Sequence, residues 1–334
     1  MALRVCLVVL FVFGPVSAQV NVRLVTDEAE AVLSVLAKRK ANQTIAETYW
    51  QRIFQSEGYV RLKKRETSMQ RSFEDADFKT FVLSDVLAQR APALEETLAR
   101  WKSAHVSGAA RLALAYLPKD AQVRAKIYPV IKPRENSFVF EVKEDPAIFL
   151  YLDPAVSQKK FENTLAHELH HIGYSGSCPA TSTAEEIRKL PANVQTVVTW
   201  VGGFGEGFAM LAAAGGPDVH PHAVSNADER ARWDKDVANF DQDLNKVEQF
   251  FLDILGNKLT EDQIQKTAYS FFGVQGPWYT VGWKMSVVIE KTFGRARLIE
   301  SFCDQRKLLA TYNEAAAKQN LPLWSKSILD ALRG

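Results

Sequence analysis

Two histidines one helical turn apart, His167 and His171, constrain the fold of this chain more than any other feature. They belong to the segment His-Glu-Leu-His-His at 167–171, an instance of the H-E-x-x-H pattern, and the sequence from Phe161 onward has helical apolar spacing. Residues four apart on an α-helix differ by about 40° in direction and about 6 Å in height. The pattern therefore predicts a helix that presents both imidazoles to a single ion.

Glu168 lies within the same pattern and has a different role. It is rotated by about 100° from His167 on a helix, which places its carboxylate beside the ion. That is the position of a general base acting on a metal-bound water. Two imidazoles and one carboxylate would leave the fourth position of a zinc tetrahedron for that water, so we expect one Zn²⁺. A histidine-rich helix face exposed to solvent is the alternative interpretation.

Glu206 is the candidate third ligand. It is the single charged residue in the nearly apolar stretch 197–214 and lies within Gly-Gly-Phe-Gly-Glu-Gly-Phe at 202–208. A carboxylate buried there without a partner would be costly, and a metal ion is one way to satisfy it. The flanking glycines allow close approach to the helix that carries His167. The alternative is an exposed glutamate at a helix start, stabilised by the helix dipole.

Tyr279 is a candidate catalytic residue. It follows Gly276-Pro277-Trp278, which is typical of a helix start. A phenol held there could stabilise the oxyanion of a tetrahedral intermediate. An aromatic side chain that simply packs at the start of a helix fits the pattern equally well.

Three further histidines need separate interpretations. His170 points about 100° away from His171, so we expect it to pack against neighbouring residues and to miss the ion. His220 and His222 follow Gly-Gly-Pro at 215–217 in a predicted loop. We expect them to face solvent or to line a rim, because the local sequence supplies too few ligands for a second metal.

The remaining pattern predicts an α+β fold that is mostly helical, with a small mixed sheet of about three strands beside the metal-binding helix. Strands are expected at 126–131, 137–142 and 147–152, where residues are β-branched or aromatic between turns. Helical spacing begins behind Thr26 and continues through Phe54 until Gly58 interrupts it, and further helices are expected at 75–89, 91–104, 108–117 and 227–255. We expect an N-terminal helical region at 19–121 and a catalytic region at 122–334, packed as one unit.

The first 18 residues predict export. A short positive segment ends at Arg4, an apolar run covers 5–16, and small residues precede Gln19. This is typical of a signal peptide cleaved after Ala18, which predicts a secreted or periplasmic protein. The run is too short to span a bilayer easily, so we expect no transmembrane segment after cleavage. An uncleaved N-terminal anchor is the alternative interpretation.

The charge balance and the cysteines limit the function further. Lysine and arginine total 41 against 39 acidic residues, which argues against nucleic acid as a partner. Cys178 and Cys303 are the two cysteines outside the signal segment. Two alternatives stay open for them, a disulfide in an oxidising compartment or two buried thiols.

The two motifs together resemble those of a known family. His-Glu-Leu-His-His at 167–171 and Gly-Glu-Gly-Phe-Ala-Met-Leu at 205–211 are similar to those of the gluzincin metallopeptidases. Among the gluzincins, the chain is most similar to an uncharacterised bacterial group of zinc-dependent peptidases, secreted or membrane-associated. The segments 59–66 and 279–285 also resemble that group. The resemblance implies a zincin-like fold, zinc ligands His167, His171 and Glu206, and Glu168 as the base. It also implies an edge strand that holds an extended peptide, for which 137–142 is the candidate.

One residue departs from the family pattern. Gluzincins often place an acidic residue shortly after the glutamate ligand, whereas Met210 stands four residues after Glu206. Support for the ligands must then come from elsewhere.

The resulting hypothesis is a zinc metallopeptidase that hydrolyses peptide or protein substrates. Two alternatives remain: an inactive zincin-like binding module of the cell envelope, and a zinc hydrolase of non-peptide amides. The sequence leaves open the substrate, endo- or exo-cleavage, the oligomeric state and whether the N-terminal region is inhibitory.

Overall fold

The computed structural model describes residues 19–178 and 181–333, and the predicted signal peptide lies outside these residues. The chain is mostly helical and carries one four-stranded sheet, which confirms the α+β prediction. The strands are β1 (Val20–Leu24), β2 (Val123–Val130), β3 (Phe138–Phe140) and β4 (Ala147–Tyr151). The N-terminal helices are α1 (Asp27–Lys40), α2 (Glu47–Phe54), α3 (Glu57–Ser68), α4 (Asp75–Val82), α5 (Asp85–Lys102) and α6 (Val106–Leu114).

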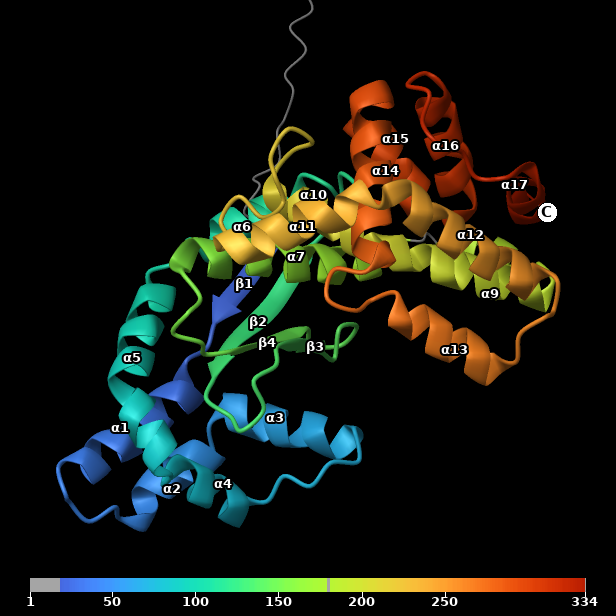
Figure 1. Cartoon of the computed structure of the whole chain (residues 1–334). Helices are drawn as coiled ribbons and strands as arrows, with labels where there is room; N and C mark the ends of the chain where they lie inside the picture. Colours follow the sequence, from blue (N-terminus) through green and yellow to red (C-terminus); the bar gives the residue numbers. More distant parts are fainter. Residues whose placement is uncertain (1–18, 179–180, 334) are drawn as a thin grey trace, which may run out of the picture.

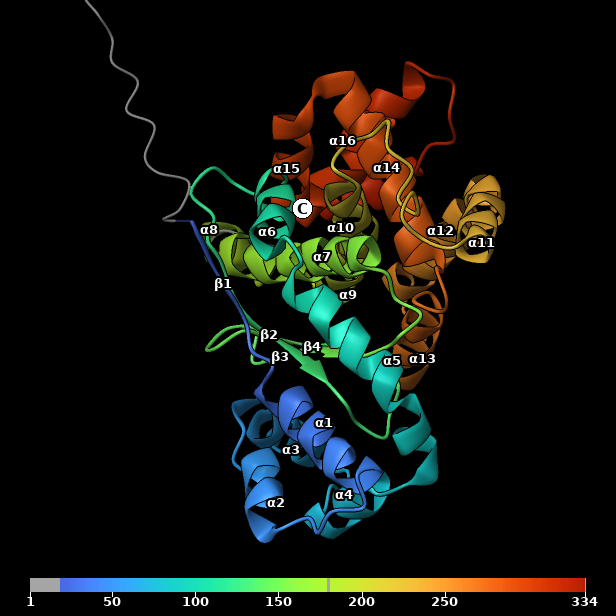
Figure 2. The same ribbon diagram turned by 90° about the vertical axis from the view of Figure 1, so that its left-hand side faces the viewer.

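The helices after the sheet form the second half of the molecule. They are α7 (Gln158–Ser177), α8 (Thr181–Ile187), α9 (Ala192–Val201), the short 3₁₀ helix η2 (Gly202–Phe204), α10 (Gly205–Ala214), α11 (Ala227–Ala238), α12 (Phe240–Leu255), α13 (Glu261–Ser270), α14 (Pro277–Phe293), α15 (Arg295–Cys303), α16 (Gln305–Ala317) and α17 (Lys326–Arg333). Figures 1 and 2 show the sheet and α7 in the middle, with α1–α4 on one side and α12–α17 on the other.

The sheet is mixed and has the order β1-β2-β4-β3. Strands β1, β2 and β4 are parallel, while β3 runs antiparallel to β4 and forms one edge. All three predicted strands are present, but the prediction missed β1. Its five residues pair with β2 in the register Val22 to Ala125. Its residues alternate apolar and polar side chains, as those of a half-buried strand do, so a local signal for β1 was present directly after the signal segment. The region expected to be purely helical thus contributes a strand to the sheet.

Several predicted helix boundaries are wrong for local reasons. The stretch 26–54 divides after Ala41, where Asn42 has a positive φ of 52°. Gly58 does not interrupt a helix and instead lies in the first turn of α3. The stretch predicted as one helix at 227–255 divides at Asn239, although its apolar residues before and after the break are buried. Asparagine is a weak helix former, so a short break there costs little.

Helix α7 separates two apolar cores. Its residues Leu165 and Leu169 are fully buried in a cluster with the sheet, α1 and α5. A second cluster joins α9, α10, α12 and α14 to the C-terminal helices. The stretch 192–214 is long and apolar enough to cross a membrane, but 61% of its most apolar window is buried within the protein. Such burial is typical of a core helix.

A disulfide joins Cys178, just after α7, to Cys303 at the end of α15. It decides between the two alternatives that the sequence left open. The bond ties the end of the histidine-bearing helix to the C-terminal helices.

Candidate metal centre

Helix α7 brings His167 and His171 together as their spacing predicts. The helix begins after Ser157, whose hydroxyl accepts a hydrogen bond from the backbone N–H of Lys160. Its apolar face is buried against the sheet, so the face with the two histidines points away from the strands. The two rings meet edge to face, and their Nε2 atoms are 3.0 Å apart. Two facing imidazole nitrogens at this distance need a proton or a cation between them.

Glu206, in the first turn of α10, completes the group. Its Oε2 lies 3.2 Å from Nε2 of His167 and 3.2 Å from Nε2 of His171. The carboxylate is 20% exposed, so it is not the solvated helix-start glutamate of the alternative interpretation. Zinc bonds of about 2.0–2.1 Å in a tetrahedron would place neighbouring ligand atoms about 3.3 Å apart. The three atoms therefore fit one zinc ion, with the remaining tetrahedral position free of these side chains.

Two glycines set the position of α10 against α14. A Cβ added at Gly207 would overlap the backbone nitrogen of Trp283, and one added at Gly282 would overlap the carbonyl oxygen of Phe204. The two helix backbones therefore touch where only glycine fits. We expected the glycines around Glu206 to allow a close approach to α7. That expectation is wrong, because the close backbone contact is with α14. Gly205 faces open space.

Tyr279 lies at the centre because α14 crosses α10 so closely. It stands in the first turn of α14, which begins at Pro277 as predicted. The Tyr279 ring stacks nearly parallel to that of His167, with centroids 6.4 Å apart. Burial, and then the negative charge of Glu206, raise the pKa of Tyr279. The phenol thus stays protonated at neutral pH and can donate a hydrogen bond.

Glu168 is half-buried on α7, one residue after His167. Within the described part of the chain, its carboxylate takes part in no hydrogen bond or ion pair. Its charge raises the pKa of both His171 and Tyr279, although in each case it is the weakest of the contributions. The carboxylate is therefore close to the centre and free to accept a proton.

Comparison with known proteins gives one result. Residues 33–321 match the family described as "Putative zinc dependent peptidase (DUF5700)". The chain belongs to this family. Neither a curated protein nor a solved structure matches it. The zinc dependence in the family description agrees with the His-His-Glu donor set, which zinc favours.

The three candidate ligands of this zinc-peptidase family member influence one another's charge. Burial raises the pKa of Glu206, but the charges of His171 and His167 and their hydrogen bonds outweigh it, so the pKa lies well below its usual value. Burial lowers the pKa of His171, and Glu206 more than compensates, so that the pKa is raised. An ionised carboxylate between two imidazoles is suited to hold a divalent cation.

No acidic side chain supports the candidate ligands at the position where gluzincins often place one. Nδ1 of His167 is buried and has no hydrogen-bond partner among the described residues. Met210 lies one turn after Glu206 on α10 and offers no charge. The His167 ring is therefore positioned by its stacking on Tyr279 and by Glu206 at Nε2, without an acidic partner at Nδ1 among the described residues.

A pocket of about 360 Å³ opens beside the centre and was not predicted. Its wall consists of His171, Tyr174, Ser175, Thr199, Trp200, Gly202, Gly203, Gly205, Glu206 and Phe272. Trp200 and Phe272 come from α9 and from the segment before α14, which are distant in sequence. No local pattern could have placed these two aromatic residues next to the ligands.

The other histidines lie outside the metal group. His170 is 1% exposed, approaches the carbonyl oxygen of Tyr116 at 3.4 Å and packs on Phe208, which confirms its packing role. The expectation of a solvent-facing His222 is wrong: it is buried, with Nδ1 2.9 Å from the Ser225 hydroxyl. His220 pairs with Asp234 at 2.8 Å. In the described ranges, only His167, His171 and Glu206 form a three-ligand group.

Proposed function

We propose that the chain is an exported, gluzincin-type zinc metallopeptidase. One observation carries the proposal: Nε2 of His167, Nε2 of His171 and Oε2 of Glu206 converge within 3.2 Å of one another. The free carboxylate of Glu168 on the same helix and the family match support it. A zinc ion bound there polarises a carbonyl and lowers the pKa of water.

Glu168 and Tyr279 would then supply the remaining catalytic groups. Glu168 accepts a proton from the attacking water and later delivers it to the leaving amine. Tyr279 donates a hydrogen bond to the developing oxyanion from its phenol, which lies in the first turn of α14 beside His167. Neither role requires a further residue.

Two features support a peptide as the substrate. Strand β3 pairs with β4 on one side only, so its other edge can accept an extended chain by backbone hydrogen bonding. The pocket that contains Trp200 and Phe272 adjoins the ligands and holds no charged side chain except His171 and Glu206. It therefore suits an uncharged side chain next to the bond that is cleaved.

Export is supported by two independent features. Residues 1–18 have the composition of a signal peptide. The disulfide between Cys178 and Cys303 is of a kind that persists mainly outside the cytosol. We therefore place the mature chain in the periplasm or outside the cell.

Glu168→Gln tests the assignment of the base. We expect this variant to keep its zinc and to lose peptide hydrolysis by about 100-fold or more, because an amide cannot accept the proton. Glu314→Gln, an exposed glutamate on α16, is the matched control and should retain full activity.

The substrate panel should contain a peptide library and cell-wall fragments. Full activity of Glu168→Gln would contradict its role as the base. Cleavage of cell-wall fragments alone would reject the peptidase assignment in favour of a hydrolase of non-peptide amides.

A further inference from the structure

A second pocket lies in the N-terminal part of the molecule and belongs to no part of the metal centre. It has a volume of about 300 Å³, at the small end of the range for ligand sites. Its wall comes from α3, from the segment that leads into α4, and from the residues that follow β2. An apolar floor is formed by Leu62, Phe73, Phe78 and Pro133. This size suits one or two residues of a peptide.

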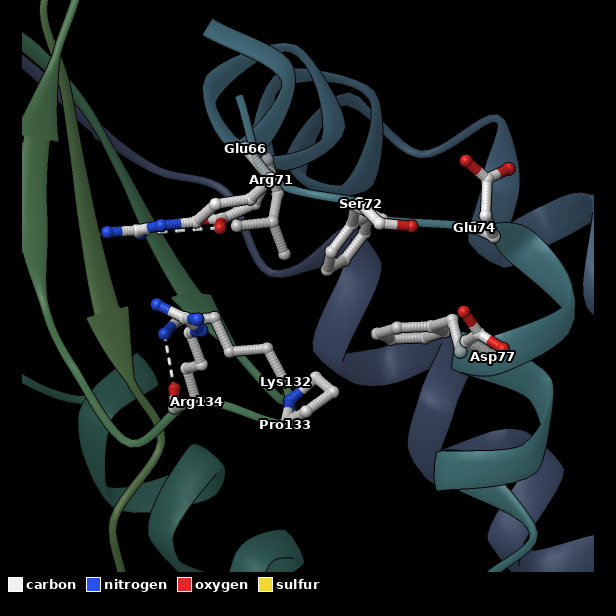
Figure 3. A pocket seen from close by; sticks show the side chains of 11 residues that line it. Glu66, Arg71, Ser72, Glu74, Asp77, Lys132, Pro133 and Arg134 are labelled. Atoms are coloured by element: carbon white, nitrogen blue, oxygen red, sulfur yellow. Dashed lines mark hydrogen bonds and ion pairs between the residues drawn. The ribbon is translucent and has the colours of Figure 1, made fainter. Parts of the chain in front are cut away.

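Basic side chains occupy one side of the pocket. Figure 3 shows the nitrogen ends of Arg71, Lys132 and Arg134 on the same side. Lys132 is 3% exposed, and among the described residues its ammonium group donates only to neutral oxygens, those of the Arg134 backbone and the Asn136 side chain. The carboxylates of Glu66 and Glu28 influence it by their charge without an ion pair. Burial lowers the pKa of Lys132 to about 8. A buried ammonium group without an ion pair is costly, and an incoming anion would relieve that cost.

The arginines are also incompletely paired. In residues 19–178 and 181–333, the Arg134 guanidinium forms neither a hydrogen bond nor an ion pair. Arg71 lies 3.5 Å from Oε2 of Glu66, while Arg65 binds Oε1 of the same carboxylate at 2.7 Å. Arginine pairs well with a carboxylate through two parallel hydrogen bonds. The basic side of the pocket thus has unused donors.

Acidic side chains limit the kind of anion that fits. Glu74 and Asp77 lie on the opposite side of the same pocket, and Glu66 lies beside Arg71 on the basic side (Figure 3). They would repel a ligand with several negative charges, such as a nucleotide. A single carboxylate attached to an apolar body matches the basic side, the apolar floor and the acidic side together.

The pocket adjoins the start of the free edge strand. Lys132 lies 5.6 Å above the ring of Phe138, the first residue of β3. A peptide that pairs antiparallel with β3 would run toward Phe138 and end there with its carboxyl terminus. We propose that the pocket lined by Arg71, Lys132 and Arg134 binds the terminal carboxylate and last apolar side chain of a peptide aligned on β3. The peptide ligand rests on the proposed function, whereas the carboxylate preference rests on the pocket alone.

The test measures binding instead of cleavage. The probe is a fluorescein-labelled ten-residue peptide of alternating valine and threonine that ends in phenylalanine, with a free or an amidated terminus. The protein is the full mature chain with Glu168→Gln, and fluorescence anisotropy gives the affinity. We expect amidation to weaken binding about tenfold or more, since it removes the charged partner of the arginines.

Arg134→Gln, added to the same protein, should reduce the affinity for the free acid to that for the amide and leave amide binding unchanged. Arg134 is exposed, so its replacement spares the core. Arg230→Gln, an exposed arginine on α11, is the matched control and should bind like the parent protein. Equal affinities for acid and amide, or equal loss in both arginine variants, would overturn the proposal.

Two further measurements separate this proposal from the proposed function. Displacement of the peptide by millimolar inorganic phosphate as readily as by acetyl-phenylalanine would mark a general anion site and would overturn it. Zinc content and hydrolysis are measured on the chain that retains Glu168. If hydrolysis is absent but acid and amide still differ, the pocket assignment stands. If the acid and the amide peptide bind with equal affinity, the pocket proposal fails, while the proposed zinc peptidase activity still stands.

Discussion

Single residues show where sequence reasoning succeeds and where it stops. Glu206 could be predicted to need a partner because it is a lone carboxylate in an apolar stretch, and it lies against the two imidazoles. His167 and His171 follow from helical geometry alone. The stacking of Tyr279 on His167 could not be predicted, because it depends on how α14 crosses α10. The burial of His222 also depends on residues distant in sequence, among them Trp233.

Glu28 carries a prediction about pH at this scale. It is fully buried in α1, one oxygen accepts the Ile131 backbone N–H, and the other has no partner among the described residues. Burial raises its pKa from 4.5 to about 8. Between these values the folded protein therefore holds a proton that the unfolded chain has lost. The stability is full below about pH 4.5 and falls as the pH rises toward 8, by at most about 1.4 kcal/mol per pH unit.

Urea unfolding between pH 5 and 8 measures this effect. Glu28→Gln should flatten the decline, since a neutral amide can still accept the Ile131 hydrogen bond. Glu95→Gln, an exposed glutamate on α5, should follow the parent protein. Equal slopes for Glu28→Gln and the parent would show that Glu28 does not cause the dependence.

The contact between α10 and α14 matters most at the scale of elements. Each helix could be predicted from its own periodicity and start residues, including Pro277. Their crossing could not, because it is defined by Gly207 on one helix and Gly282 on the other. Local sequence patterns locate the helices, but close backbone contacts between helices determine which helix starts lie next to each other. Here they bring Glu206 and Tyr279 to the same place.

Gly207→Ala is predicted to separate these helices. The added methyl group overlaps the backbone of α14, so we expect a loss of about 1–3 kcal/mol in stability and weaker zinc binding. Thermal unfolding and zinc titration with a competing chelator measure the two effects. Gly205→Ala, whose methyl group meets open space, is the control on the same helix. Similar behaviour of both variants would contradict the role of the close contact.

At the scale of the whole molecule, two long-range links join parts that the sequence shows as separate. Strand β1 carries the N-terminal region into the sheet beside β2. The disulfide between Cys178 and Cys303 connects residues 125 positions apart. The fold class could be predicted from composition and period. The alternation at 20–24 indicates a strand without specifying its partner, and no local pattern pairs the two cysteines. Their partners are specified only by the assembled core.

Removal of the disulfide should destabilise the chain without altering the ligands. A loop of this length confines the unfolded chain, so the double variant Cys178→Ala, Cys303→Ala should lose about 3–5 kcal/mol. Urea unfolding of the chain that begins at Gln19 measures the loss, and thiol titration of the parent under denaturing conditions should find no free thiol. Two free thiols in the parent, or equal stability of the variant, would contradict the bond.

Zinc content is the most direct test of the central claim, that His167, His171 and Glu206 hold one zinc ion. Elemental analysis of the purified chain should find about one zinc per molecule, and His167→Ala should lose most of it while circular dichroism shows a folded protein. His105→Ala, an exposed histidine before α6, should keep its zinc. A parent chain without zinc, or a folded His167→Ala with equimolar zinc, would contradict the account.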